Sequence, residues 1–145
     1  MKTYVITLSK NFMKGHPKEG NPTNFINRFI SHDKIHTIRA NYSLWEKRIK
    51  EIEAAKAILS IRVWKDKSYR SGQIEIETLS CINNVGIQKI EFTNDLTECI
   101  IEGKHYSYTE VAKNDGLLPE DFLSWFKQSD TSEPLAIIHF TKFRY

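Results

Sequence analysis

Six consecutive residues carry the most informative pattern of this chain, Lys34-Ile35-His36-Thr37-Ile38-Arg39. Side chains alternate between the two faces of a strand, so Thr37 and Arg39 are expected to share one face. His36 and Ile38 lie on the other face, where His36 is expected to be a satisfied core or rim histidine. Lys34 joins Thr37 and Arg39 only if the chain turns just before Ile35. With that turn, an amine, a hydroxyl and a guanidinium surround one spot, which predicts a pocket for an electron-rich, planar or phosphorylated ligand.

The segments on either side of this stretch show apolar residues at strand or helix spacing. Strands are expected at residues 3–8, 57–64, 73–79, 86–92, 98–102 and 135–145. Helices are expected at residues 23–30, 43–54, 107–114 and from 119 onward. Ser43 and Ser107 each precede a glutamate by three residues, which fits a capping box at two of the helix starts. Pro119 suits the first turn of the last helix.

Strands come first in this order, helices are inserted, and the chain returns to a strand. The order predicts a small α+β domain with a curved mixed sheet or a small β-barrel, flanked by short helices. The aromatic residues Trp45, Trp125 and Phe126 are expected in its core. Strands and helices do not alternate regularly and the chain has no Gly-rich phosphate loop, so a doubly wound nucleotide-binding fold is disfavoured.

A length of 145 residues suits one domain, expected to span residues 1–145. The hydrophobic content of 40% and the aromatic content of 12% indicate a globular chain. No apolar run approaches the ~20 residues that cross a bilayer, so no membrane partner is expected. Cys81 and Cys99 lack metal-ligand spacing and favour a reduced, cytoplasmic location. The histidines also lack the spacing of a metal site, and the sequence predicts no metal or other cofactor.

Charge is distributed unevenly along the chain. Residues 1–70 carry 15 Lys and Arg against 6 Asp and Glu, a net charge of +9, whereas residues 71–145 carry 6 against 12, a net charge of −6. Such asymmetry is typical of a protein that binds nucleic acid or another polyanion. A basic half that neutralises an acidic half within one compact fold gives the same pattern, and composition does not separate the two interpretations.

The pattern formed by Lys34, Thr37, Ile38 and Arg39 resembles the K-x-x-T-I-R signature of the ASCH family, which has a PUA-like fold. The segment Thr23–Phe29 is also similar to the aromatic and basic helix that precedes this signature. Family members that act as N4-acetylcytidine amidohydrolases use the lysine and threonine of the signature. They add an acid just before a helix in the C-terminal half. The resemblance therefore implies Lys34, Thr37 and Asp115 as catalytic residues, with aspartate where those enzymes have glutamate.

Amide hydrolysis gives these residues coherent roles. Burial of Lys34 near Arg39 disfavours the charged lysine, so a neutral amine is available to take the Thr37 hydroxyl proton. Asp115 then handles the proton that moves to the leaving nitrogen. Each residue also has a purely structural interpretation. Lysines before strands are usually solvated, threonine is a good strand former, and Asp115 lies in an Asn-Asp-Gly sequence typical of turns.

A second group of cationic and aromatic residues lies at the end of the 57–64 strand and in the loop after it. Its candidate ligand-binding members are Arg62 and Trp64, on one face of the strand, and Tyr69 and Arg70 in the loop. Aromatic rings interleaved with cations suit single-stranded nucleic acid, because bases stack on rings while cations meet phosphates. A solvated hairpin tip is the structural alternative. The loop at residues 9–18 is expected either to add a basic wall beside the Lys34–Arg39 stretch or to be an ordinary flexible loop.

Three hypotheses follow. The first is a binding module that takes RNA or a modified nucleoside in a pocket formed by Lys34, Thr37 and Arg39. The second is an amidohydrolase of acetylated cytidine with Thr37 as nucleophile, Lys34 as base and Asp115 as acid. The third is a protein-interaction domain with a vestigial pocket.

Overall fold

The computed structural model describes residues 1–66 and 72–145, and within them the chain is an α+β fold with two sheets and four α-helices. The first sheet has the order β1-β3-β4, with β1 (Lys2–Leu8), β3 (Ala57–Trp64) and β4 (Gln73–Leu79). β1 and β3 run parallel while β3 and β4 run antiparallel, so this sheet is mixed. The mixed sheet agrees with the sequence-based prediction.

The second sheet is antiparallel throughout and has the order β2-β8-β5-β6-β7. Its strands are β2 (His36–Arg39), β5 (Gly86–Phe92), β6 (Glu98–Ile101), β7 (Lys104–Ser107) and β8 (Leu135–His139). The two sheets do not close into a barrel within the described residues, so the barrel alternative is wrong for this part of the chain.

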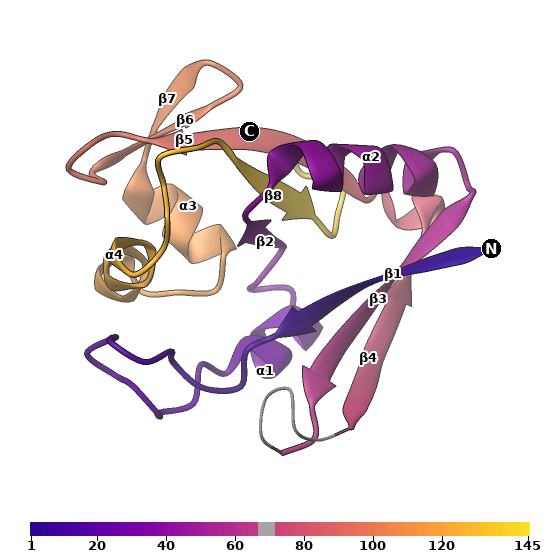
Figure 1. Cartoon of the computed structure of the whole chain (residues 1–145), viewed down its shortest axis with the longest axis horizontal. Helices are drawn as coiled ribbons and strands as arrows, with labels where there is room; N and C mark the ends of the chain where they lie inside the picture. Colours follow the sequence, from indigo (N-terminus) through magenta and orange to yellow (C-terminus); the bar gives the residue numbers. More distant parts are fainter. Residues whose placement is uncertain (67–71) are drawn as a thin grey trace.

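Helices connect and cover the two sheets, as Figure 1 shows. They are α1 (Phe25–Ile30), α2 (Tyr42–Glu53), α3 (Tyr108–Asn114) and α4 (Pro119–Lys127), with a short 3-10 helix, η1 (Cys81–Asn83). α2 contacts β3 of the first sheet as well as β5 and β8 of the second. α3 packs against α4 and against β6 and β7. β2 is the edge strand of the second sheet, next to β8, and it lies near the middle of the molecule (Figure 1).

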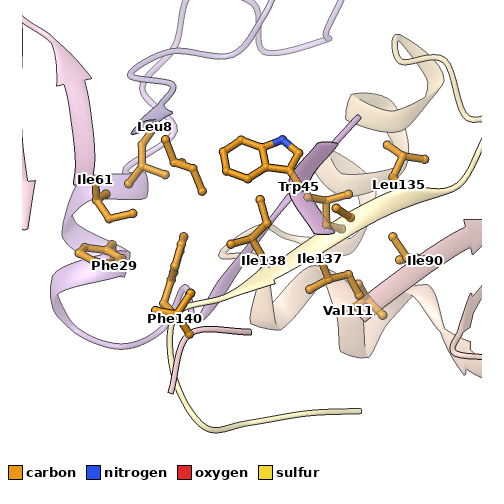
Figure 2. Packing of buried hydrophobic residues seen from close by; sticks show 14 of the residues in the cluster. Leu8, Phe29, Trp45, Ile61, Ile90, Val111, Leu135, Ile137, Ile138 and Phe140 are labelled. Carbon is orange, nitrogen blue, oxygen red and sulfur yellow. The ribbon is translucent and has the colours of Figure 1, made fainter. Parts of the chain in front are cut away.

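One hydrophobic cluster runs through both sheets. In Figure 2, Trp45 from α2 and Ile138 from β8 lie between the Leu8 and Ile61 side of the cluster and the Ile90 side. Burial of these large side chains supplies the main driving force of folding. Trp45 and Phe126 are buried as predicted, whereas Trp125 is only partly buried and packs against the edge of the cluster.

Two local predictions are wrong, and one strand was missed. α2 begins at Tyr42 and is capped by Asn41, whose side chain accepts a hydrogen bond from the Leu44 amide at 3.3 Å, so Ser43 lies inside the first turn. Asn41 has a φ of 66°, a left-handed conformation that asparagine tolerates better than most residues. β7 was not predicted, because its side chains are mostly exposed and show no apolar alternation. The last strand ends at His139 instead of continuing to Tyr145.

No helix in the described part of the chain is long and apolar enough to cross a membrane. The described residues also contain no group of three or more histidine, cysteine, aspartate or glutamate side chains arranged to hold a metal ion.

Candidate functional site

Lys34 reaches the site because the chain bends sharply after α1. His32 has a φ of 66°, and the Lys34 amide donates to the Arg28 carbonyl at 2.9 Å. Lys34 then forms an isolated antiparallel bridge with Asp115, two residues before β2 begins. The Ile35 amide extends this pairing by donating to the Asn114 carbonyl at 2.9 Å. Lys34 thus lies outside the strand. The chain makes the turn before Ile35 that Lys34 needs in order to lie near Thr37.

The Lys34 side chain is buried and points at Asp115. Its Nζ donates to the Asp115 carbonyl oxygen at 2.7 Å and to Oδ1 of the same residue at 3.1 Å. The ammonium also lies 4.2 Å from the centre of the Phe25 ring, a favourable cation–π position. These contacts compensate for the loss of water around the charge, and they exclude the solvated-lysine interpretation.

Asp115 combines a turn position with a central role in the site. It ends α3, where its amide donates to the Val111 and Ala112 carbonyls. Gly116 follows with a φ of 78°, and a Cβ there would lie 2.9 Å from the Lys34 Cβ, so a larger residue would push the lysine away. The Asp115 carboxylate nevertheless points inward, and its side chain is only 7% exposed.

His36 belongs to the same network, which the sequence did not predict. Asn114 Nδ2 donates to the Tyr145 hydroxyl at 2.9 Å, and the distance from this hydroxyl to His36 Nε2 is 2.7 Å. The tyrosine proton therefore goes to Nε2, and His36 Nδ1 carries the ring proton that it donates to Asp115 Oδ1 at 3.2 Å. His36 is a satisfied core histidine, as expected, but it also holds the carboxylate.

Burial and the neighbouring charges shift the pKa values of these groups. Burial lowers the pKa of Lys34, the nearby charge of Arg39 adds to this effect, and Asp115 opposes it only in part. Burial alone would raise the pKa of Asp115, but the charge of Lys34 and the hydrogen bond from His36 outweigh it and hold the pKa below the usual range. Burial also lowers the pKa of His36. At neutral pH the network therefore contains an ionised Asp115 and a neutral His36.

A small cavity of about 10 Å³ lies beside Lys34. Its polar lining comes from Lys34, Thr37, Arg39 and Asp115. Its aromatic lining comes from Phe25, Trp125 and Phe126. The structure thus brings four predicted site residues to one place and adds aromatic walls that the sequence analysis did not assign to the site. A volume of this size holds roughly one water molecule.

Thr37 and Arg39 occupy different positions in this cavity. Thr37 is only 4% exposed, and none of the described residues forms a hydrogen bond with its hydroxyl. Arg39 is partly buried, and its Nη2 donates to the Thr7 carbonyl of β1 at 2.8 Å. Arg39 therefore links the second sheet to the first, and the Thr37 hydroxyl is left available to a ligand.

The second predicted group is separate from the cavity. Arg62 Nε donates to Ser60 Oγ at 2.9 Å and its Nη1 donates to Gln73 Oε1 at 3.3 Å, so the guanidinium is tied into the first sheet. Trp64 is partly buried on the same strand. Neither residue lines the cavity. Tyr69 and Arg70 lie outside the residues that the structure describes.

The loop at residues 9–18 does not form the basic wall that was considered. Lys10 donates to the Lys65 carbonyl at 3.0 Å, and Lys18 forms an ion pair with Asp121 of α4 at 2.7 Å. His16 is buried, stacks on Phe12 with ring centres 4.4 Å apart, and lies 3.1 Å from the Asp121 carbonyl oxygen. The loop is thus fastened to α4, and Ser9 is its contribution to the cavity.

Comparison with known proteins adds no assignment to this geometry. No protein-family model matches the chain, no curated protein is significantly similar to it, and no solved structure matches it.

Proposed function

We propose that the cavity beside Lys34 receives a nucleobase or a modified nucleoside, and that the protein is an RNA- or nucleobase-binding domain of the ASCH and PUA-like type. One observation carries this proposal. Lys34, Thr37, Arg39 and Asp115 come from distant parts of the chain and line one cavity together with aromatic side chains.

The lining suits the chemistry of a base. The edge of a nucleobase presents N–H donors and carbonyl or ring-nitrogen acceptors, and its faces stack on aromatic rings. The Thr37 hydroxyl both donates and accepts, while the Asp115 carboxylate accepts and Lys34 and Arg39 donate. Phe25 and Trp125 supply ring surfaces on the same cavity. Polar groups that converge beside aromatic and aliphatic side chains are typical of small-molecule sites.

A base enters only if the cavity widens, because the present volume is close to that of one water molecule. Trp125 of α4 and Ser9 at the start of the loop form one side of the cavity. His16 and Lys18 fasten this loop to Asp121 of α4. The loop and α4 are therefore expected to move together when a ligand enters, and the fluorescence of Trp125 should report that movement.

The test is a titration of the protein with cytidine and N4-acetylcytidine, followed by tryptophan fluorescence. Thr37→Val keeps the side-chain shape but removes the hydroxyl, so affinity should fall about five- to tenfold, the effect of one lost hydrogen bond. Thr3→Val on the exposed part of β1 is the matched control and should bind like the unchanged protein. Absence of saturable binding by either nucleoside would contradict the proposal and favour the protein-interaction hypothesis.

Amidohydrolase activity is a second candidate, favoured by the contact between Lys34 and Asp115 at 3.1 Å and by the available Thr37 hydroxyl. In this reaction a neutral Lys34 takes the Thr37 proton, and the threonine oxygen attacks the acetyl carbon of the substrate. The amide C–N bond breaks as Lys34 returns the proton to the cytosine nitrogen, and water then releases acetate from the threonine ester. The lowered pKa of Asp115 suits a carboxylate that positions Lys34 better than an acid that donates a proton.

Acetate release from N4-acetylcytidine tests this second candidate. Thr37→Ala and Lys34→Ala should each abolish the release, because the first removes the nucleophile and the second removes its base. A protein that binds the nucleoside but releases no acetate at high protein concentration is a binding module alone.

A further inference from the structure

The Arg28 side chain of α1 has no hydrogen-bonding or charged partner in the described part of the chain. Its Nε is buried, and none of the described residues accepts a hydrogen bond from it. Its guanidinium forms no ion pair with the described acidic side chains. Buried polar groups in folded proteins almost always have a partner, so this donor requires an explanation.

The Arg28 side chain lies between two adjoining hollows. The larger has a volume of about 590 Å³ and the smaller about 120 Å³, and Arg28, Leu117 and Leu118 line both. His32 and Lys113 add two more basic side chains to the larger hollow. We call this surface the Arg28 groove. Its lining includes Arg28, His32, Asp33, Lys113, Leu117 and Leu118.

The acidic side chains that line the two hollows, Asp33 and Asp121, form no ion pair with Arg28. Asp33 accepts a hydrogen bond from the Ser31 hydroxyl at 3.0 Å. In the smaller hollow Asp121 is held by Lys18 at 2.7 Å. Arg28 therefore keeps a buried donor that is unused, and Lys113 and His32 line the same groove.

The Arg28 groove adjoins the candidate site. The Arg28 carbonyl accepts the Lys34 amide at 2.9 Å, and Asn114 lines the groove while the next residue, Asp115, lines the cavity. A Cβ on Gly116 would meet Lys34 Cβ at 2.9 Å and Arg28 Cδ at 3.4 Å, so these two basic side chains pack side by side against one glycine.

We propose that the Arg28 groove binds a phosphate of an RNA strand whose base occupies the cavity beside Lys34, an inference that rests on the proposed function. The planar guanidinium offers paired N–H groups that match two phosphate oxygens. Lys113 adds positive charge, His32 offers ring nitrogens, and Leu117 and Leu118 provide an apolar wall beside the phosphate. The unused Nε of Arg28 is the donor that the phosphate satisfies, after a shift of the side chain that exposes this buried atom.

The experiment measures the anisotropy of a labelled single-stranded RNA between about 50 and about 200 mM salt. Arg28→Gln should weaken binding about fivefold or more and lower the salt slope by roughly one, since one phosphate contact is lost. Arg48→Gln is the matched control, because Arg48 is also half-buried but lies on α2 against the Tyr4 and Trp45 rings. This variant should keep the RNA affinity and the salt slope. Lys113→Gln gives a second, exposed substitution in the groove and should lower the slope as well.

The outcomes separate the groove from the cavity. Cytidine carries no phosphate, so its binding to Arg28→Gln should be unchanged. If cytidine binds but Arg28→Gln and Lys113→Gln leave RNA affinity and salt slope intact, the groove proposal is overturned while the proposed function stands. If RNA binding depends on Arg28 but no nucleoside binds, the groove stands and the proposed function fails. If inorganic phosphate binds in an Arg28-dependent way and RNA does not, the assignment to an RNA phosphate is overturned.

Discussion

Asp115 is the residue on which the candidate site depends, because one of its carboxylate oxygens accepts from both Lys34 and His36. The same residue ends α3 and forms the bridge that fixes Lys34 next to it. Asp115 therefore fixes the backbone next to Lys34 and also supplies the negative charge that pairs with the Lys34 ammonium. The aspartate reaches Lys34 directly although it is one methylene shorter than a glutamate.

Asp115→Asn should lower the free energy of unfolding by about 3–5 kcal/mol, because it leaves the buried Lys34 ammonium without its counter-ion. Adding Lys34→Met to this variant should recover part of the loss, since the two residues are directly coupled. Urea denaturation measures both effects. Asp33→Asn, at an exposed position, is the control and should change stability by about 0.5 kcal/mol or less. An unchanged midpoint for Asp115→Asn would contradict the described network.

His139 makes stability depend on pH. It is fully buried, its Nδ1 has no partner among the described residues, and burial lowers its pKa to about 2. Below about pH 6.5 the unfolded chain binds protons on this histidine while the folded chain does not, so stability falls as pH decreases. The loss should approach about 1.4 kcal/mol per pH unit for His139, and the lowered pKa of His36 adds a loss of the same sign.

Urea midpoints measured from about pH 7.5 to about pH 5 test this dependence. His139→Gln removes one titrating group and keeps a polar side chain, so its stability should vary less steeply with pH. His105→Gln is the control, because His105 is exposed and pairs with Glu98 at the surface. Stability that stays flat over this range would show that neither histidine is protonated differently on unfolding.

At the scale of elements, local sequence signals predicted the starts of α3 and α4 correctly and the start of α2 wrongly. Ser107 caps α3 and Pro119 opens α4, as the sequence indicates, because each signal acts within one turn of the chain. α2 begins one residue early because Asn41 takes the capping role from Ser43. β7 was missed since an exposed hairpin strand lacks the apolar alternation on which such predictions depend.

Asn41→Ala should lower the free energy of unfolding by about 1–2 kcal/mol, because it removes the cap of α2 and places alanine in a left-handed conformation. Thermal or urea unfolding measures the loss. Ser43→Ala lies in the first turn and should stay within about 0.5 kcal/mol of the unchanged protein. A larger loss for Ser43→Ala than for Asn41→Ala would mean that the serine is the cap after all.

The candidate site was predictable only where its residues are close in sequence. Thr37 and Arg39 follow from strand alternation. The same alternation places Lys34 and His36, two residues apart, on the same side of an extended chain. It therefore indicates that His36 can join Lys34 in the site. The partnership of His36 with Tyr145 was not predictable, because residues 140–145 were expected to continue the last strand instead of folding back toward β5. Contacts between distant segments of this kind leave no periodic trace in a single sequence.

At the scale of the whole molecule, the cavity lies where the two sheets meet. Leu8 and Ser9 at the end of β1 line it from the first sheet, and Thr37 and Arg39 of β2 line it from the second. Arg39 joins the sheets directly through the Thr7 carbonyl, and α2 packs on both of them. α4 adds the aromatic wall. Ligand binding in the cavity is therefore expected to affect residues of both sheets and of α4.

The most direct test of the central claim is an NMR titration of the labelled protein with cytidine and N4-acetylcytidine. The account predicts saturable shifts of the Lys34, Thr37 and Asp115 amides and of the Trp125 indole, with the Trp64 indole unchanged. The Thr37→Val variant should show the same pattern at higher ligand concentration. Shifts that cluster around Arg62 and Trp64 instead, or no shifts at millimolar nucleoside, would contradict the claim that the cavity beside Lys34 is a nucleobase site.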